Sequence, residues 1–183
     1  MKFMLTMLLL GASLVMALPA VADEVPPQPV AHLDLSRYQG TWYEIARYPN
    51  SFQAPCVSGD MAQYRILPNG TYSVLNSCRK ADGSVGEISG EARPDSHAPD
   101  ASGQLQVRFA PTWLKWLPLV WARYWVIVLD PDYRYAVVSE PTRHYLWILS
   151  RTPALDSASY GAILDQLAAQ GYDLSKLIKT TQP

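Results

Sequence analysis

The stretch Gly40-Thr41-Trp42-Tyr43-Glu44-Ile45-Ala46-Arg47 decides the fold of this chain. In the run before it, Asp34 and Ser36 can cap a single helical turn, and Gly40 then lets the backbone swing into an extended strand. Alternation places Trp42, Glu44 and Ala46 on one face and Tyr43, Ile45 and Arg47 on the other. Because both faces carry large side chains, we expect this strand to lie between a core and a covering element.

The first 22 of the 183 residues have the pattern of a secretory signal peptide. Lys2 precedes an apolar run from Phe3 to Leu18, and the cleavage site is Ala20-Val21-Ala22. This run is too short for a membrane span. We therefore expect a signal peptide at 1–22, a flexible Pro-rich leader at 23–32 and one folded domain at 33–183.

Charge and cysteine content narrow the classes of partner and cofactor. The net charge is -1 and no basic cluster occurs, so nucleic acid is not an expected partner. Cys56 and Cys78 form an even pair in an exported chain, and such a pair most often forms a disulfide. The two thiols and the scattered histidines have no metal-ligand spacing, so we expect neither a metal nor another cofactor. The histidines are His32, His97 and His144.

Strand signals recur at short intervals after the opening stretch, separated by turn residues. The clearest hairpin joins Asp60–Leu67 to Thr71–Cys78 through Pro68-Asn69-Gly70. Eight consecutive strands favour an all-β, up-and-down antiparallel barrel, because closure removes exposed edges. A two-sheet sandwich is the alternative, but it usually needs long crossovers that these loops cannot supply. The remaining strands are expected at 85–92, 105–109, 124–129, 135–139 and 145–149.

The tail changes to a helical period. From an N-cap at Asp156 or Ser157, apolar residues follow at helical spacing as far as Gly171, which suits a C-terminal cap. The single apolar stripe predicts an α-helix packed on the outside of the barrel. Residues 174–180 could add a short ninth strand.

Three short motifs give the chain a resemblance to the lipocalin family: Gly40-x-Trp42, Asp130-x-Asp132-Tyr133 and Leu149-Ser150-Arg151. The likeness covers residues 33–182. It is closer still to the bacterial branch, which also includes plant and apolipoprotein D-like members. The resemblance implies an eight-stranded calyx with all three motifs at its closed end, where Arg151 lies across the Trp42 indole. Structural roles follow for Gly40, Trp42, Asp132 and Arg151.

The family topology implies that the connection from Ala110 to Ala122 lies at the open end. This connection contains Trp113, Trp116 and Trp121 together with four aliphatic residues, and such a loop should not face water. It could fold over the pocket, insert shallowly at a membrane surface or form a homodimer interface. Cys56 and Cys78 are expected at the same end.

The family's inward register implies an aromatic and aliphatic pocket wall that suits a long acyl chain, since each buried methylene is worth about 0.8 kcal/mol. Glu44 is the exception on the inward face. A buried, unpaired carboxylate is costly, so we expect it to meet an arginine or a tyrosine hydroxyl near the floor, or to stay protonated. The implied ligand-binding residues are Tyr64, Val74, Asn76, Leu105, Val107, Phe109, Trp125, Tyr145 and Trp147.

The resemblance implies a periplasmic, non-enzymatic carrier of fatty acids or lysophospholipids, which could lie peripherally at the outer membrane. Position 23 is Asp, so a lipid-anchor cysteine is missing at the expected cleavage point. An alternative is an envelope-stress or assembly factor that acts through the Trp-rich loop. A lipid-modifying enzyme is a third hypothesis, but no set of nucleophile, base and orienting group is visible.

Overall fold

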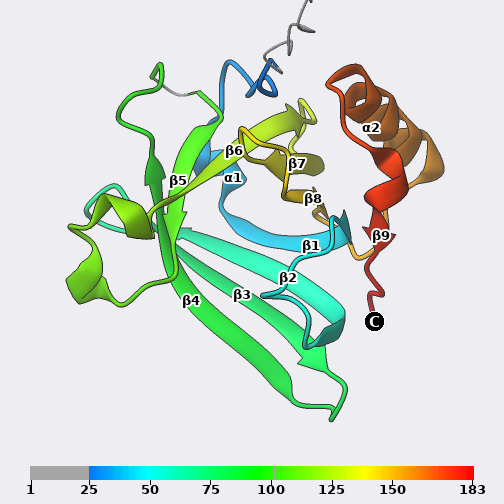
Figure 1. The fold of residues 1–183 in the computed structure, drawn as a ribbon, viewed down its shortest axis with the longest axis horizontal. Coiled ribbons are helices and arrows are strands. Elements are labelled where there is room, and N and C mark those ends of the chain that lie inside the picture. Colours follow the sequence, from blue (N-terminus) through cyan, green and yellow to red (C-terminus); the bar gives the residue numbers. More distant parts are fainter. Residues whose placement is uncertain (1–24, 101) are drawn as a thin grey trace, which may run out of the picture.

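The strands form one antiparallel sheet that closes into a barrel (Figure 1). The computed structural model describes residues 25–100 and 102–183. Each strand from β2 to β7 pairs with the next along the chain, and β1 pairs with both β8 and β2. This confirms the eight-stranded up-and-down barrel. The expected signal peptide lies outside the described residues. The strands are β1 (Gly40–Arg47), β2 (Cys56–Ile66), β3 (Tyr72–Lys80), β4 (Val85–Pro94), β5 (Gln104–Arg108), β6 (Ala122–Leu129), β7 (Tyr135–Ser139) and β8 (Leu146–Ser150).

A short helix, α1 (Leu35–Tyr38), leads into β1. The Asp34 carboxylate caps it by accepting hydrogen bonds from the backbone N–H groups of Ser36, at 2.8 Å, and Arg37, at 3.4 Å. Gly40 follows with φ of 100°, and a Cβ on it would lie 3.2 Å from an Arg151 guanidinium nitrogen. Glycine is therefore required here both by its backbone conformation and by the close approach of Arg151.

A β-bulge interrupts the predicted alternation of β1. The register against β8 shifts between Glu44 and Ala46, so Glu44 faces the interior with Trp42, while Ala46 turns outward. The prediction that Ala46 shares a face with Trp42 and Glu44 is therefore wrong. The extra residue in the bulge also brings Arg47 to the face that carries Glu44, and the two side chains form an ion pair.

The described residues form two hydrophobic clusters, one inside the barrel and one between its wall and α2 (Ser157–Ala169). Figure 1 shows α2 beside the barrel, outside the sheet. The Asp156 carboxylate caps this helix by accepting the Ser159 N–H at 2.9 Å, and Ile163 and Leu167 are fully buried against the wall. The predicted amphipathic helix is confirmed.

The C-terminal tail completes the wall between β1 and β2. These strands pair with each other only through Gly40–Tyr43 and Met61–Tyr64. Beyond that point the tail lies between them: Thr180 N–H donates to Ile45 at 3.0 Å, and Gly59 N–H donates to Thr181 at 2.8 Å. The predicted ninth strand is confirmed, but it is short. A 3₁₀ turn, η3 (Leu174–Lys176), precedes the strand β9 (Ile178–Lys179).

Cys56 and Cys78 form the predicted disulfide, which links β2 to β3 with a Cα–Cα distance of 5.6 Å.

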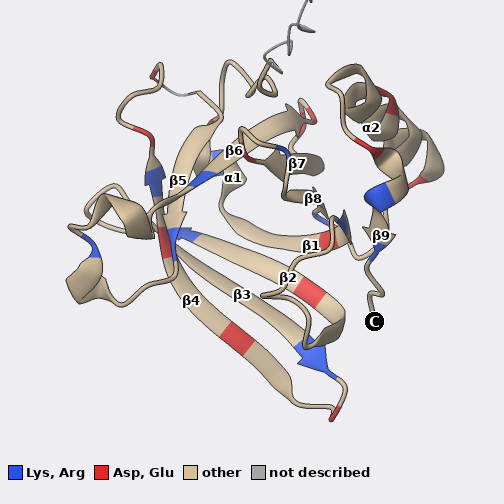
Figure 2. Ribbon diagram, in the orientation of Figure 1, with Lys and Arg blue, Asp and Glu red and all other residues tan. Residues whose placement is uncertain are grey.

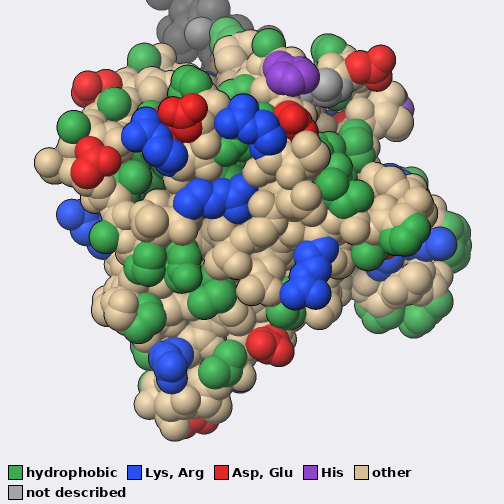
Figure 3. All heavy atoms as spheres, turned by 180° about the vertical axis from the view of Figure 1, so that it is seen from behind, with side chains coloured by type: hydrophobic (Ala, Val, Ile, Leu, Met, Phe, Trp, Pro, Cys, Tyr) green, Lys and Arg blue, Asp and Glu red, His purple; other side chains and the backbone are tan. Residues whose placement is uncertain are grey.

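Within residues 25–100 and 102–183, none of the helices has the length and apolar character needed to cross a membrane. On the outer face seen in Figure 3, basic, acidic and hydrophobic side chains lie interspersed.

Candidate functional site

The closed end of the barrel is built around Trp42, which is fully buried. The Arg151 guanidinium lies over its indole, 3.8 Å from the ring centroid, as expected. Trp42 Nε1 donates to the Tyr38 carbonyl at 2.7 Å. Arg151 also donates to the carbonyls of Arg37 at 2.7 Å and Thr41 at 2.9 Å. The Arg151 guanidinium therefore links β1 to α1 beneath the floor.

The turn between β6 and β7 is held by Asp130 rather than by Asp132. The buried Asp130 carboxylate accepts the backbone N–H groups of Asp132 and Arg134 and two guanidinium bonds from Arg134, at 2.9 and 2.7 Å. These bonds hold the pKa of Asp130 below its usual value. Asp132 is exposed, and its carboxylate accepts no hydrogen bond from the described part of the chain. The sequence prediction placed the structural role two residues too late.

Strand pairing shows which side chains face the interior. Trp42 lies opposite Ala62, Ala62 opposite Asn76, and Asn76 opposite Ile88. Directly opposed residues share a face of the sheet, so this row lines the barrel. The same reasoning places nearly all of the predicted ligand-binding residues inside: Tyr64, Val74, Asn76, Leu105, Val107, Phe109, Tyr145 and Trp147.

Trp125 is the exception, because it lies on the outer face. Leu105, which faces inward, is opposite Tyr124, whereas Trp125 is opposite Gln104 and packs with the cluster beneath α2. The predicted register was one residue out on β6, and a shift of one residue moves a side chain to the other face. Tyr124 is therefore the inward residue that the sequence analysis missed. Because Tyr124 and Trp125 are adjacent and both aromatic, the local sequence did not show which of them faces inward.

Three tyrosine hydroxyls meet above Trp42 and close the lower half of the barrel. The Tyr124 hydroxyl lies 2.9 Å from those of both Tyr38 and Tyr64. Burial raises the pKa of Tyr64 to about 12, and those of Tyr38 and Tyr124 are also raised, chiefly by burial. All three hydroxyls are therefore protonated and neutral at physiological pH.

Three large apolar side chains on the inner face of the upper half of the barrel are exposed. Ile88 is 50% exposed, Phe109 38% and Tyr145 39%, although all three lie on the inner face. Gly90 makes room for Phe109, because a Cβ on Gly90 would lie 2.6 Å from the Phe109 ring. Inward side chains of a filled barrel would be buried, so this exposure indicates that the protein's own side chains do not fill the barrel above the tyrosine floor.

Glu44 pairs with Arg47, whose guanidinium lies 3.0 Å from its carboxylate, so one of the expected partners is present. Burial raises the pKa of Glu44 more than its hydrogen bonds to Thr180 and Gln53 lower it. Asp60, from β2, lies close to Glu44, and its pKa is also raised by burial. Arg47, Gln53 and Asp60 join this site only through the tertiary structure.

The Trp-rich loop extends from the side of the barrel (Figure 1) as two 3₁₀ turns, η1 (Thr112–Leu114) and η2 (Pro118–Val120). Trp113 and Trp116 are each 73% exposed. Trp121 is instead anchored, because the Arg93 guanidinium lies 3.8 Å from its ring centroid and its Nε1 donates to the Lys115 carbonyl. Since Arg93 is on the outer wall, the loop does not fold over the pocket.

In the described ranges, the cluster with metal-ligand geometry contains Cys56, Asp60 and Cys78. The two sulfur atoms are bonded to each other, so they are not available as thiolate ligands.

A closed antiparallel barrel with an aromatic floor, an open apolar mouth and an outer helix defines a calyx-type binding protein. The chain belongs to the lipocalin family: the Lipocalin-like domain model matches residues 33–182.

Curated relatives agree with the family assignment, and a solved structure has the same fold. The chain is 41% identical to temperature-induced lipocalin-1 of Arabidopsis thaliana over 155 residues, which cover 84% of this chain and 81% of the relative. It is 33% identical to the outer membrane lipoprotein Blc of Escherichia coli K12, covering 90% of this chain and 89% of the relative. The structure of insecticyanin from Manduca sexta superposes with a TM-score of 0.67 at 23% identity, covering 89% and 87% of the two chains.

Proposed function

We propose that this lipocalin binds a single-chain acyl lipid, a fatty acid or a lysophospholipid, and stores or carries it in a bacterial cell envelope. The open apolar upper half of the calyx carries this proposal. Its exposed inner side chains, including Ile88 and Phe109, match a flexible hydrocarbon chain in chemistry. The signal-like residues 1–22 and the similarity to the Escherichia coli outer membrane lipoprotein support an exported, periplasmic setting.

A binding role is favoured over catalysis. The three histidines lie on separate connections: His32 before α1, His97 between β4 and β5, and His144 between β7 and β8. All three are exposed, and none of them belongs to the inner wall. Lipocalin family members are generally binding proteins, and the three tyrosine hydroxyls of the floor contact one another rather than a base.

Ile88→Lys is expected to weaken acyl-lipid binding by about 10–100-fold, because it removes an apolar contact worth about 1.5–3 kcal/mol and places a charge beside the chain. The measurement is quenching of tryptophan fluorescence during titration with fatty acids and lysophospholipids. Val85→Lys is the matched control, because Val85 is an exposed residue on the outward face of the same strand. Equal affinities for Ile88→Lys and the wild-type protein would place the lipid outside the calyx.

A second candidate function is membrane or partner contact through the Trp-rich loop, as for an envelope-stress or assembly factor. Trp113, Trp116 and Leu119 are exposed by 73%, 73% and 96%, which is unusual for large apolar residues. Tryptophan is favoured at membrane interfaces, and Lys115 lies between the two tryptophans in sequence, so an anionic lipid surface fits this loop.

The double variant Trp113→Ser/Trp116→Ser is expected to reduce binding to anionic phosphatidylglycerol vesicles by about tenfold or more, because two interfacial anchors are lost. Vesicle co-sedimentation measures this, and lipid titration checks that the calyx still binds. Undiminished sedimentation would exclude the loop as the membrane contact. A wild-type dimer that becomes monomeric in the variant would identify a homodimer interface instead.

A further inference from the structure

The inner wall carries an ionic cluster with unequal charge. Glu44 on β1 and Asp60 on β2 are each 4% exposed, and Arg47 pairs with Glu44 at 3.0 Å. Figure 2 shows the two acidic positions on these neighbouring strands. Two carboxylates thus lie near one guanidinium on the inner face of the barrel, and one of them forms an ion pair with it. With both carboxylates ionised, the cluster carries one more negative charge than positive charge.

A neutral amide lies at the position where a second positive charge would be expected. Gln53, from the connection between β1 and β2, donates from its single Nε2 atom to Glu44 at 2.7 Å and to Asp60 at 2.9 Å. Its Oε1 accepts from Trp147 Nε1 at 2.8 Å. A nitrogen that bridges two carboxylates has the geometry of a bound ammonium group, but an amide supplies no charge. The raised pKa values of Glu44 and Asp60 agree with this, since burial outweighs their hydrogen bonds.

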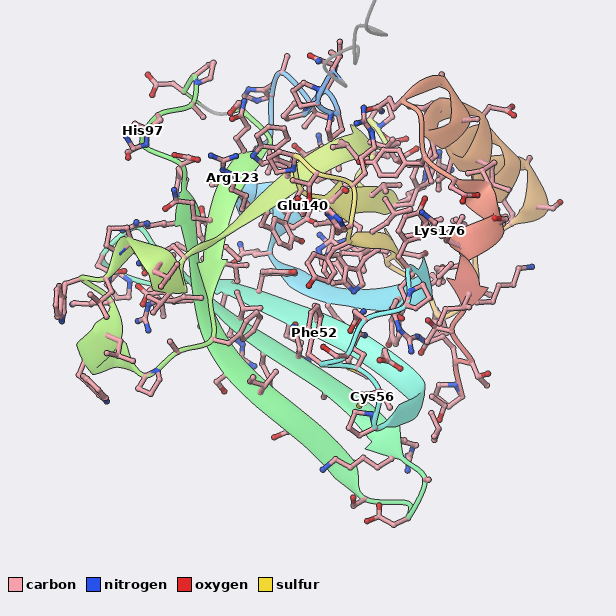
Figure 4. The ribbon with its side chains drawn as sticks, in the orientation of Figure 1. Phe52, Cys56, His97, Arg123, Glu140 and Lys176 are labelled. Carbon is pink, nitrogen blue, oxygen red and sulfur yellow. A yellow bond between two sulfur atoms is a disulfide. The ribbon has the colours of Figure 1, made fainter. Side chains whose placement is uncertain are left out.

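Aromatic rings border the same place on the side of the mouth. The rings of Phe52, Tyr145 and Trp147 form one group, with centroid distances of 5.4 Å between Phe52 and Tyr145, 6.1 Å between Phe52 and Trp147 and 5.9 Å between Tyr145 and Trp147. Figure 4 shows Phe52 between β1 and the start of β2, where Cys56 is labelled. Aromatic faces attract cations, so these rings favour a positive group rather than a negative one.

The cluster also contains an unused donor. Arg47 has a side chain only 12% exposed, and its buried Nε has no hydrogen-bond partner among the described residues. An acceptor oxygen on a ligand could satisfy it, whereas a hydrocarbon chain could not. This donor shows that the polar wall is not fully satisfied by the protein's own groups.

We propose that the calyx selects a single-chain amphiphile that carries an ammonium group, which takes the place of the Gln53 amide between Glu44 and Asp60, beside Trp147. This inference rests on the proposed lipid-binding function and names the head group of its ligand. The hydrocarbon chain lies along the open apolar wall. A fatty-acid carboxylate in the same orientation would meet two carboxylates and one guanidinium, and the net repulsion disfavours it.

Titration with four probes of one chain length tests this inference: a primary alkylamine, the corresponding alcohol, the fatty acid and a lysophosphatidylethanolamine. The wild-type protein is expected to bind the amine about tenfold more tightly than the alcohol, and the fatty acid more weakly than either. Tighter binding of the lysophospholipid than of the amine would identify a zwitterionic head group, with its phosphate on Arg47. Tighter binding of the amine would identify a simple cationic amphiphile.

Asp60→Asn is expected to reduce the preference for amine over alcohol to about twofold or less, while affinity for the alcohol is retained. Glu87→Gln is the control, because Glu87 is exposed on the outward face of β4. Gln53→Lys supplies a tethered ammonium and should abolish the preference without loss of folding, so it serves as a second test if Asp60→Asn is unstable.

Different outcomes separate the two proposals. Fatty acid binding at least as tightly as the amine, or a preference unchanged in both cluster variants, would overturn the ammonium site but leave acyl-lipid binding intact. Failure of all four probes to bind would refute the proposed function itself.

Discussion

Trp42→Ala is expected to lower the free energy of unfolding by about 3–5 kcal/mol, which is a large part of the stability of a domain of this size. The side chain is fully buried, its Nε1 donates to Tyr38, and its ring faces Arg151 at 3.8 Å. Its removal leaves a cavity in the floor and exposes the guanidinium of Arg151 to an empty space. Urea denaturation followed by circular dichroism measures the loss.

Trp113→Ala is the matched control, because it removes the same side chain from a position that is 73% exposed. Its effect is expected to stay within about 0.5 kcal/mol, as for most surface substitutions. If the two variants unfolded at the same urea concentration, the floor would not be the structural centre of the barrel.

Removal of the disulfide with Cys56→Ala/Cys78→Ala is expected to cost about 3 kcal/mol, because the bridge restricts the unfolded chain over a separation of 22 residues. The bridge joins β2 to β3 at the mouth, so its loss should also let the end of this hairpin fray. Thermal unfolding of the wild-type protein with and without a reductant measures the effect. Reduction should lower the Tm to about that of the double variant.

The double variant should not respond to the reductant, and this insensitivity is the internal control. An unchanged unfolding temperature in the wild-type protein after complete reduction, verified by thiol titration, would show that the bridge adds no stability. Ligand titration of the reduced protein separates an effect on the mouth from an effect on folding.

Local sequence patterns were sufficient for the order of the elements. Turn residues such as Pro68-Asn69-Gly70 and the periodicity from Asp156 to Gly171 depend on neighbours along the chain, and the structure confirms the hairpin and the helix there. The contact between Trp42 and Arg151 was also expected, because the family resemblance placed both motifs at the closed end.

The candidate site was predicted less completely, because the face of a side chain depends on register between strands. Trp125 and Tyr124 are adjacent aromatic residues, and only the pairing of β5 with β6 shows that Tyr124 faces inward. The bulge in β1 likewise turned Ala46 outward and brought Arg47 beside Glu44. Strict alternation in the sequence contained no sign of either change.

The sequence by itself determined the strand order, the outer helix and the closed end, because these depend on local periodicity, turn chemistry and three short motifs. Only the tertiary structure decided the polar wall of the calyx, where Gln53 joins Glu44 to Asp60 and Thr180 from the tail hydrogen-bonds to Glu44. These residues come from a loop, two strands and the C-terminal tail. Their meeting depends on the pairing of β1 with β2 and on the return of the C-terminal tail to these strands, where Thr180 lies 136 residues after Glu44 in the sequence.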